Sequence, residues 1–226
     1  MGIIPVPAPV SSAGRTKTEA TDSTSVLLNR ARGGDGQALA DLFARYRPRL
    51  RRMVRLRLDR RLHGRVDPSD VLREAAADAA RRAGECGAAS PAALFLWLRA
   101  VTGQRLQAVH QDLLGGRMGE AGHEVSLYRG ALPQANSVSL AAQLLGRLAP
   151  ASRAEEQAER QVRLQEALNN MDALDREVLA LRHFEELSND EAAAVLGVEP
   201  AVASNLYIRA LKRLKDTLSR MPGFFR

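Results

Sequence analysis

Apolar residues recur at spacings of three and four along most of this chain, and this periodicity constrains its fold more than any other feature. Such spacing forms one stripe of an α-helix, whereas a half-buried strand alternates apolar and polar residues. A stripe runs through residues 35–62, with members Leu39, Leu42, Phe43, Tyr46, Leu50, Met53 and Val54. Aromatic residues make up only 4% of the chain, which also favours packed helices. The pattern predicts an all-α protein.

Changes in composition divide the chain into four parts. Residues 1–24 are rich in Pro, Ser, Thr and Ala and lack periodicity, so we expect a disordered tail. Residues 25–114 and 154–222 carry helical patterns. Residues 115–153, rich in Gly, Ser, Pro and Gln, are too long for a connection inside one compact domain. We predict two small helical domains that are joined by a flexible linker and move independently.

Several classes of protein are disfavoured by the residues present. The single cysteine, Cys86, permits no internal disulfide, and the four His residues show no metal-ligand spacing. We therefore expect no metal and no cofactor, and the absence of a nucleophile–base pair or a phosphate-binding Gly loop argues against an enzyme. The longest apolar run, residues 91–98, is too short to span a bilayer, and the N-terminus lacks the basic region of a signal peptide. A cytoplasmic protein without membrane insertion is expected.

The charge balance favours a polyanionic partner. The formal net charge is +7, and 30 of the 33 basic residues are Arg, whose planar fork suits phosphates and guanine edges. A GC-rich genome that favours Arg codons explains the excess of Arg equally well.

Residues 188–214 have the form of a helix-turn-helix. Ser188 and Glu191 are spaced as a capping box, Gly197 fits the turn, and a second helix follows Pro200. Its apolar stripe is expected to comprise Val202, Leu206, Tyr207, Ala210, Leu211, Leu214 and Leu218. The outward face is then Ala201, Ser204, Asn205, Ile208, Arg209 and Lys212, which suits a DNA major groove. A plain helical hairpin with a polar outer face is the alternative.

The segment LQEALNNMDALDREVLALRHFEELSNDEAAAVLGVEPAVASNLYIRALKRLK, residues 164–215, closely resembles region 4 of extracytoplasmic-function RNA polymerase sigma factors. ALADLFARYRPRLRRMV (38–54), VDPSDVLREAAADA (66–79) and FLWLRAVTGQRL (95–106) resemble region 2 of the same family. The segment that contains SLAAQLLG is most similar to sigma factors of planctomycete type.

The resemblance implies a promoter-recognition subunit whose partners are core RNA polymerase, at its β′ clamp and β flap, and promoter DNA. Region 4 would read the −35 element through the outward face of its second helix. Region 2 would bind polymerase through Asp70, Arg73 and Glu74, for which favourable electrostatics at a helix terminus is the alternative role. The −10 strand would be contacted by one polar helix face, comprising Gln104, Gln107, His110 and Gln111; an ordinary solvated face is the alternative for this set. An anti-sigma protein is a further candidate partner.

Two other interpretations stay open. The chain could be a helix-turn-helix transcriptional regulator with a non-sigma N-terminal interaction domain, although the resemblance of residues 67–83 and 95–106 to region 2 argues against this. It could also be a sigma-like regulator that binds polymerase but no longer reads promoters. Ala203 and Asn205, which stand where relatives often have basic residues, keep that alternative open.

Overall fold

The computed structural model describes residues 13–114, positions 133, 135, 137 and 139–142, and residues 154–219. Within these residues all regular structure is helical, which confirms the predicted all-α class. The longer helices are α1 (Ala13–Arg32), α2 (Gly36–Arg57), α3 (Pro68–Arg81), α4 (Pro91–Leu114), α6 (Ala154–Asn169), α7 (Ala173–Leu179), α8 (Asn189–Leu196) and α9 (Pro200–Ser219). Short turns of helix lie at Arg60–Leu62, Ala83–Glu85 and Ala180–Phe184, the last a π-helix that continues α7.

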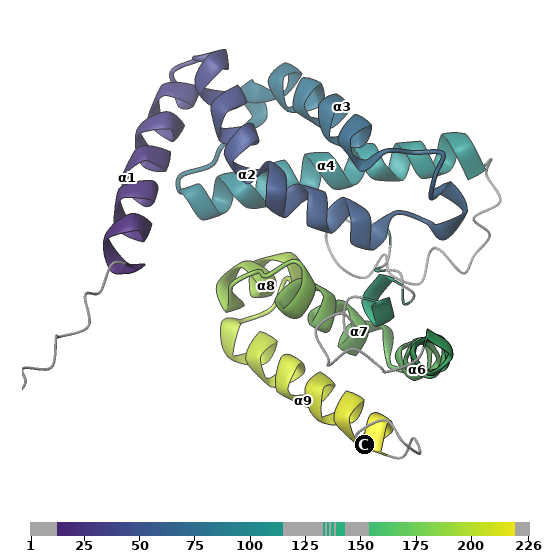
Figure 1. Ribbon diagram of the computed structural model, residues 1–226. Helices are drawn as coiled ribbons and strands as arrows, with labels where there is room; N and C mark the ends of the chain where they lie inside the picture. Colours follow the sequence, from purple (N-terminus) through teal and green to yellow (C-terminus); the bar gives the residue numbers. More distant parts are fainter. Residues whose placement is uncertain are drawn as a thin grey trace, which may run out of the picture.

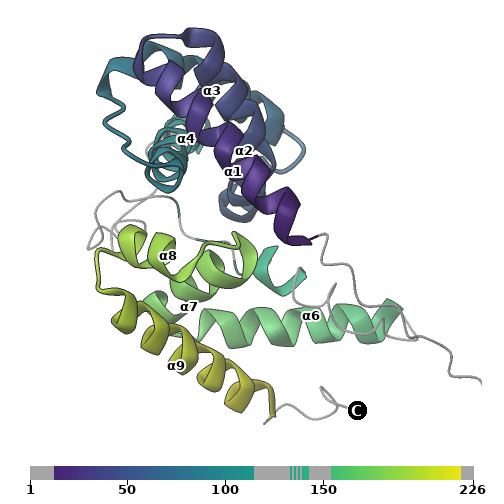
Figure 2. The same ribbon diagram turned by 90° about the vertical axis from the view of Figure 1, so that its left-hand side faces the viewer.

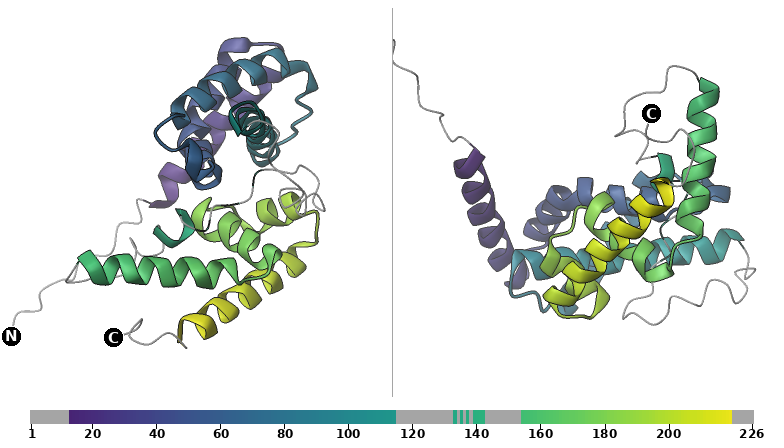
Figure 3. Two further views of the ribbon diagram at one scale, coloured as in Figure 1. Left: turned by 90° about the vertical axis from the view of Figure 1, so that its right-hand side faces the viewer. Right: turned by 90° about the horizontal axis from the view of Figure 1, so that it is seen from below.

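Helices α1–α4 pack together as an N-terminal module, and α6–α9 pack together as a C-terminal module (Figure 1). In the first, α2, α3 and α4 contact one another around Leu42, Leu72 and Leu98, which are fully buried. In the second, α9 lies across α7 and α8, and α6 runs along one side (Figure 3).

Helix starts follow the capping signals of the sequence. The Asp35 carboxylate accepts a hydrogen bond from the Ala38 amide at 3.0 Å, and α2 begins at the next residue, Gly36. Asp67 accepts from the Ser69 amide at 2.7 Å, with Pro68 at the first helical position of α3. Side-chain caps of this kind satisfy amides that have no partner within the helix.

Helix α1 is longer than predicted. It begins at Ala13 rather than near Ser25, so the expectation of a disordered tail through residue 24 is wrong for residues 13–24. No Gly or Pro stands between Arg15 and Arg32, and a helix that is nucleated by packing can therefore propagate through this segment. Residues 1–12 lie outside the described part of the chain.

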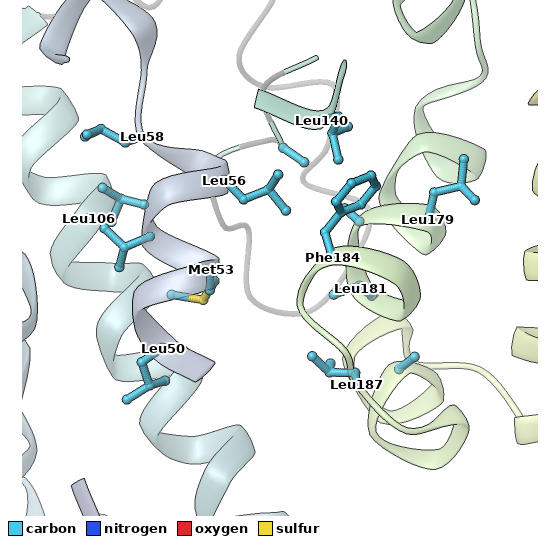
Figure 4. Packing of buried hydrophobic residues seen from close by; sticks show 14 of the residues in the cluster. Leu50, Met53, Leu56, Leu58, Leu106, Leu140, Leu179, Leu181, Phe184 and Leu187 are labelled. Carbon is cyan, nitrogen blue, oxygen red and sulfur yellow. The ribbon is translucent and has the colours of Figure 1, made fainter. Parts of the chain in front are cut away.

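The two modules pack against each other, whereas the sequence predicts modules that move independently. Contacts join α2 to the π-helix Ala180–Phe184 and α4 to α8, and one continuous apolar cluster extends through both modules. In Figure 4, Leu56 of α2 faces Phe184, with Leu140 beside it. Leu140 belongs to the predicted linker, of which the described positions Ala135, Leu140 and Ala141 are buried. The rest of residues 115–153 lies outside the described part of the chain.

Candidate nucleic-acid interface

The helix-turn-helix has the geometry that its sequence indicates. The Ser188 hydroxyl accepts from the Glu191 amide at 3.1 Å, and the Glu191 carboxylate accepts from the Ser188 amide at 2.8 Å, which completes the capping box. Gly197 ends α8 with φ of 67°, a left-handed conformation that costs little without a Cβ. Helix α9 starts three residues later and lies on the side of the C-terminal module that faces away from α2 and α4 (Figure 2).

The buried face of α9 differs in part from the predicted stripe. Its buried residues are Ala203, Ala210, Leu214 and Leu218, and Leu206 and Tyr207 are half-buried. Val202 is 45% exposed and Leu211 is also exposed, so placing these two in the core was wrong. The small Ala203 lies in the core instead, because a methyl group fits where α9 crosses close to α7 and α8.

Four of the six residues that were predicted for the outward face of α9 are exposed. Ala201, Asn205, Ile208 and Lys212 are exposed. Ser204 is half-buried, and its hydroxyl donates to the Asn189 side-chain oxygen at 2.9 Å.

Arg209 is exposed but turned toward its own module. Its guanidinium donates to the buried Asp175 carboxylate at 2.6 and 3.0 Å, and Arg213 donates to the same carboxylate. Asp175 thus ties α7 to α9 through two arginines. The ion pair therefore engages two of the three guanidinium nitrogens of Arg209, Nε and Nη2.

The three residues predicted to bind polymerase share one exposed face of α3. Asp70 pairs with Arg73 at 3.0 Å, and Glu74 lies 3.5 Å from Arg105 of α4. All three are exposed, so the side chains are available to a partner. Arg73 also lines an apolar groove between α2 and α3, together with Leu39, Phe43, Leu72 and Ala76 among others.

Only some residues of the predicted polar face of α4 are exposed to solvent. Gln104 and Gln111 are exposed and Gln107 is half-buried; the Gln104 side-chain oxygen accepts from Arg82 at 2.6 Å. His110 is 2% exposed, and its Nε2 accepts from the Asp59 amide at 3.2 Å, so its inclusion in a DNA-contacting face is corrected. Burial lowers the pKa of His110, in keeping with a neutral ring that accepts this bond.

A buried ionic cluster between the modules was missed by sequence reasoning. Glu185, which is 1% exposed, accepts from Arg57 at 2.8 Å and from Arg99 at 2.7 Å. Arg57 also donates to Glu177 at 2.6 Å and to the Pro133 carbonyl oxygen at 2.9 Å. Burial alone opposes the charged form of Arg57, yet Glu177 and Glu185 outweigh it and hold the pKa of Arg57 above its ordinary value.

Two further ion pairs flank this cluster. Arg49 donates to both carboxylate oxygens of Glu191, at 2.8 and 3.2 Å, and its guanidinium lies 3.6 Å from the centroid of the Phe95 ring. At the surface, Arg52 lies 3.0 Å from Glu186. Four arginines of the N-terminal module therefore meet four glutamates of the C-terminal module. In the sequence these arginines look like parts of solvated helix faces.

Among the described residues, no group of His, Cys, Asp and Glu is arranged to hold a metal ion. No helix within that part of the chain has the length and apolar character needed to cross a membrane.

Comparison with known proteins finds a family match for the C-terminal module. Residues 161–214 match the family model described as sigma-70, region 4. No curated protein matches the chain. Among solved structures it is similar to one described as the structure of CnrH in complex with the cytosolic domain of CnrY. That match has 19% sequence identity and a TM-score of 0.49, and covers 86% of this chain and 96% of the other. The helix-turn-helix therefore lies in a segment that is similar to sigma-70 region 4, as its sequence resemblance predicts.

Proposed function

We propose that this chain is a sigma factor of the extracytoplasmic-function type, which binds core RNA polymerase and directs it to specific promoters. The observation that carries the proposal is the match of residues 161–214 to sigma-70 region 4, over a capped helix-turn-helix whose outward helix face is exposed. The polymerase supplies the chemistry and this subunit supplies recognition, so the chain itself is not an enzyme. A protein with this function acts in the bacterial cytoplasm.

Each module has a separate role in this proposal. Helix α9 reads the −35 element, the exposed face of α3 with its adjoining groove binds the polymerase β′ clamp, and region 4 also meets the β flap. The −10 element is opened by α4, with Gln104, Gln107 and Gln111 as the available polar contacts. An anti-sigma protein stays a candidate partner on the sequence resemblance.

Run-off transcription with purified core polymerase and a promoter library tests the function as a whole. The chain should confer transcription from a defined subset of promoters, and core polymerase alone should not.

A helix-turn-helix regulator is the second candidate function. It is favoured by the extent of the family match, which covers 161–214 and leaves α1–α4 outside it. Such a regulator would bind DNA with the same preference whether or not core polymerase is present, and would start no transcription.

Reversing two charges on α3 should weaken polymerase binding. The double substitution Asp70→Lys/Glu74→Lys inverts the exposed acidic pair, and we expect the affinity for core polymerase to fall about tenfold or more, because like charges across an interface are strongly unfavourable. Titration of labelled protein with core polymerase measures this. Asp112→Lys/Glu159→Lys reverses two exposed acids elsewhere and is the control. Equal affinities for both double variants would remove α3 from the interface.

Two single substitutions on α9 should have different effects on DNA binding. Asn205 lies at the centre of the outward face and can read adenine through two hydrogen bonds, so Asn205→Ala should cost about 1–3 kcal/mol at one base pair. Lys212 lies further along the helix and should meet phosphate, so Lys212→Ala should weaken all sequences alike and reduce the salt slope by about one. Binding to a −35 library at two salt concentrations separates these effects. A uniform loss for Asn205→Ala would exclude base reading by that residue.

A further inference from the structure

Two of the exposed large apolar side chains of the described residues stand on the N-terminal half of α9. Ile208 is 63% exposed and Val202 is 45% exposed. Single apolar residues on a surface are common, so exposure alone carries little weight. Their position on the helix is more informative, because helix-turn-helix proteins insert the N-terminal part of the second helix into the major groove.

The two side chains lie on either side of Asn205. At about 100° per residue, Val202 and Ile208 stand roughly 60° from Asn205 in opposite directions around the helix axis. All three are exposed, and the opposite face holds the buried Ala203 and Ala210. A groove that receives Asn205 along its midline therefore receives an apolar side chain on each side of it.

The polar residues that could compete for these bases are held elsewhere. Ser204 donates to Asn189, and Arg209 donates to the buried Asp175 carboxylate. What remains near the start of the helix is an amide flanked by apolar groups. In the major groove, the base feature that an apolar side chain can recognise is the C5 methyl group of thymine.

The charges on α9 fit a DNA partner rather than an apolar protein surface. Lys212 and Lys215 are exposed about two to three turns beyond Asn205, where a helix leaves the floor of the groove and meets phosphates. An apolar patch that is followed by two exposed lysines on the same helix matches the base edges and backbone of a duplex.

We propose that Val202 and Ile208 are specificity-determining residues that contact thymine methyl groups on either side of the base read by Asn205. This inference rests on the proposed function, in which α9 binds the −35 element. The expected −35 element therefore has thymines on either side of its central position, and α9 recognises them through their methyl groups rather than through hydrogen bonds.

Replacing thymine by deoxyuridine tests this directly, because only the methyl group is removed. The full-length chain is assembled with core polymerase, and its preferred −35 element is selected from a library. Each thymine is then replaced by deoxyuridine in turn. We expect about a three- to fivefold loss of affinity at each of two positions, the effect of about one buried methyl group. Ile208→Ala should abolish the loss at one position and Val202→Ala at the other.

Controls separate this inference from folding and from the proposed function. Ile208→Val retains a branched apolar side chain and should keep the deoxyuridine effect, and Val162→Ala truncates an exposed side chain on α6 and should change nothing. The inference is overturned if the preferred element has no flanking thymines. It is also overturned if deoxyuridine causes no loss of affinity, or if the loss is the same in both Ala variants as in the wild-type chain. Sequence-specific binding stays intact in each of these cases. Failure of the wild-type holoenzyme to prefer any element overturns the proposed function as well.

Discussion

Glu185→Gln should separate the two helical modules at neutral pH. The substitution keeps the size of a side chain that is almost fully buried but removes the charge that compensates Arg99 and that, together with Glu177, compensates Arg57. Removing one partner from a buried ionic group typically costs about 3–5 kcal/mol, because the remaining charges stay desolvated. Parting of the modules relieves that cost, since both arginines then reach water. Small-angle scattering should show a larger radius of gyration than that of the wild-type chain.

The adjacent residue offers a matched control. Glu186→Gln makes the same change of charge one position later, but its ion pair with Arg52 is exposed on both sides. Exposed pairs contribute about 0–1 kcal/mol, so this variant should remain docked. If Glu185→Gln and Glu186→Gln have the same radius of gyration, the buried ionic cluster does not hold the modules together.

The same cluster gives docking a defined dependence on pH. Burial raises the pKa of Glu185, but Arg57 and Arg99 outweigh it and hold the pKa below its ordinary value. A group whose pKa is lowered in the docked state stabilises that state fully above the ordinary pKa, and the contribution is lost as the pH falls through the lowered value. Scattering of the wild-type chain should therefore show opening on acidification below the ordinary range of Glu. The contribution of this carboxylate is absent from Glu185→Gln at every pH.

Local features of this fold could be predicted from the sequence because their causes are local. The capping box of Ser188 and Glu191 and the start of α3 at Pro68 depend on residues within one helical turn. On α9 the exposed positions Asn205 and Lys212 were also predicted, from periodicity alone. Val202 was predicted in the core because it is hydrophobic, but it is exposed, and the smaller Ala203, which was in neither predicted set, is buried where α9 packs on α7 and α8.

The ionic cluster could not be predicted because its causes are distant in sequence. Arg99 and Glu185 are 86 residues apart, and Arg49 and Glu191 are 142 residues apart. In the sequence, an Arg that is buried and ion-paired looks the same as an Arg on a solvated helix face, because its partner lies far away along the chain. The docking of the modules was missed for the same reason, and so was the burial of His110, which depends on the Asp59 amide of another segment.

Phe184→Ala should produce a loss of stability comparable to that of Glu185→Gln, by a different physical route. Phe184 is buried in the apolar cluster and faces Leu56 across the contact between the modules (Figure 4). Truncating a buried Phe to Ala usually costs about 3–5 kcal/mol, from lost burial and from the cavity that remains. Denaturant unfolding measures the loss, and Val162→Ala, a truncation at a position that is 55% exposed, should change it by about 0.5 kcal/mol or less.

The double variant Phe184→Ala/Glu185→Gln distinguishes one shared contact from two independent ones. If both residues act through docking, the first substitution already parts the modules and the second has less docked structure to destabilise. The combined loss should then be smaller than the sum of the single losses, as is usual for residues that share partners. Strict additivity would mean that Phe184 stabilises the C-terminal module by itself, and that the ionic cluster alone keeps the two modules in contact.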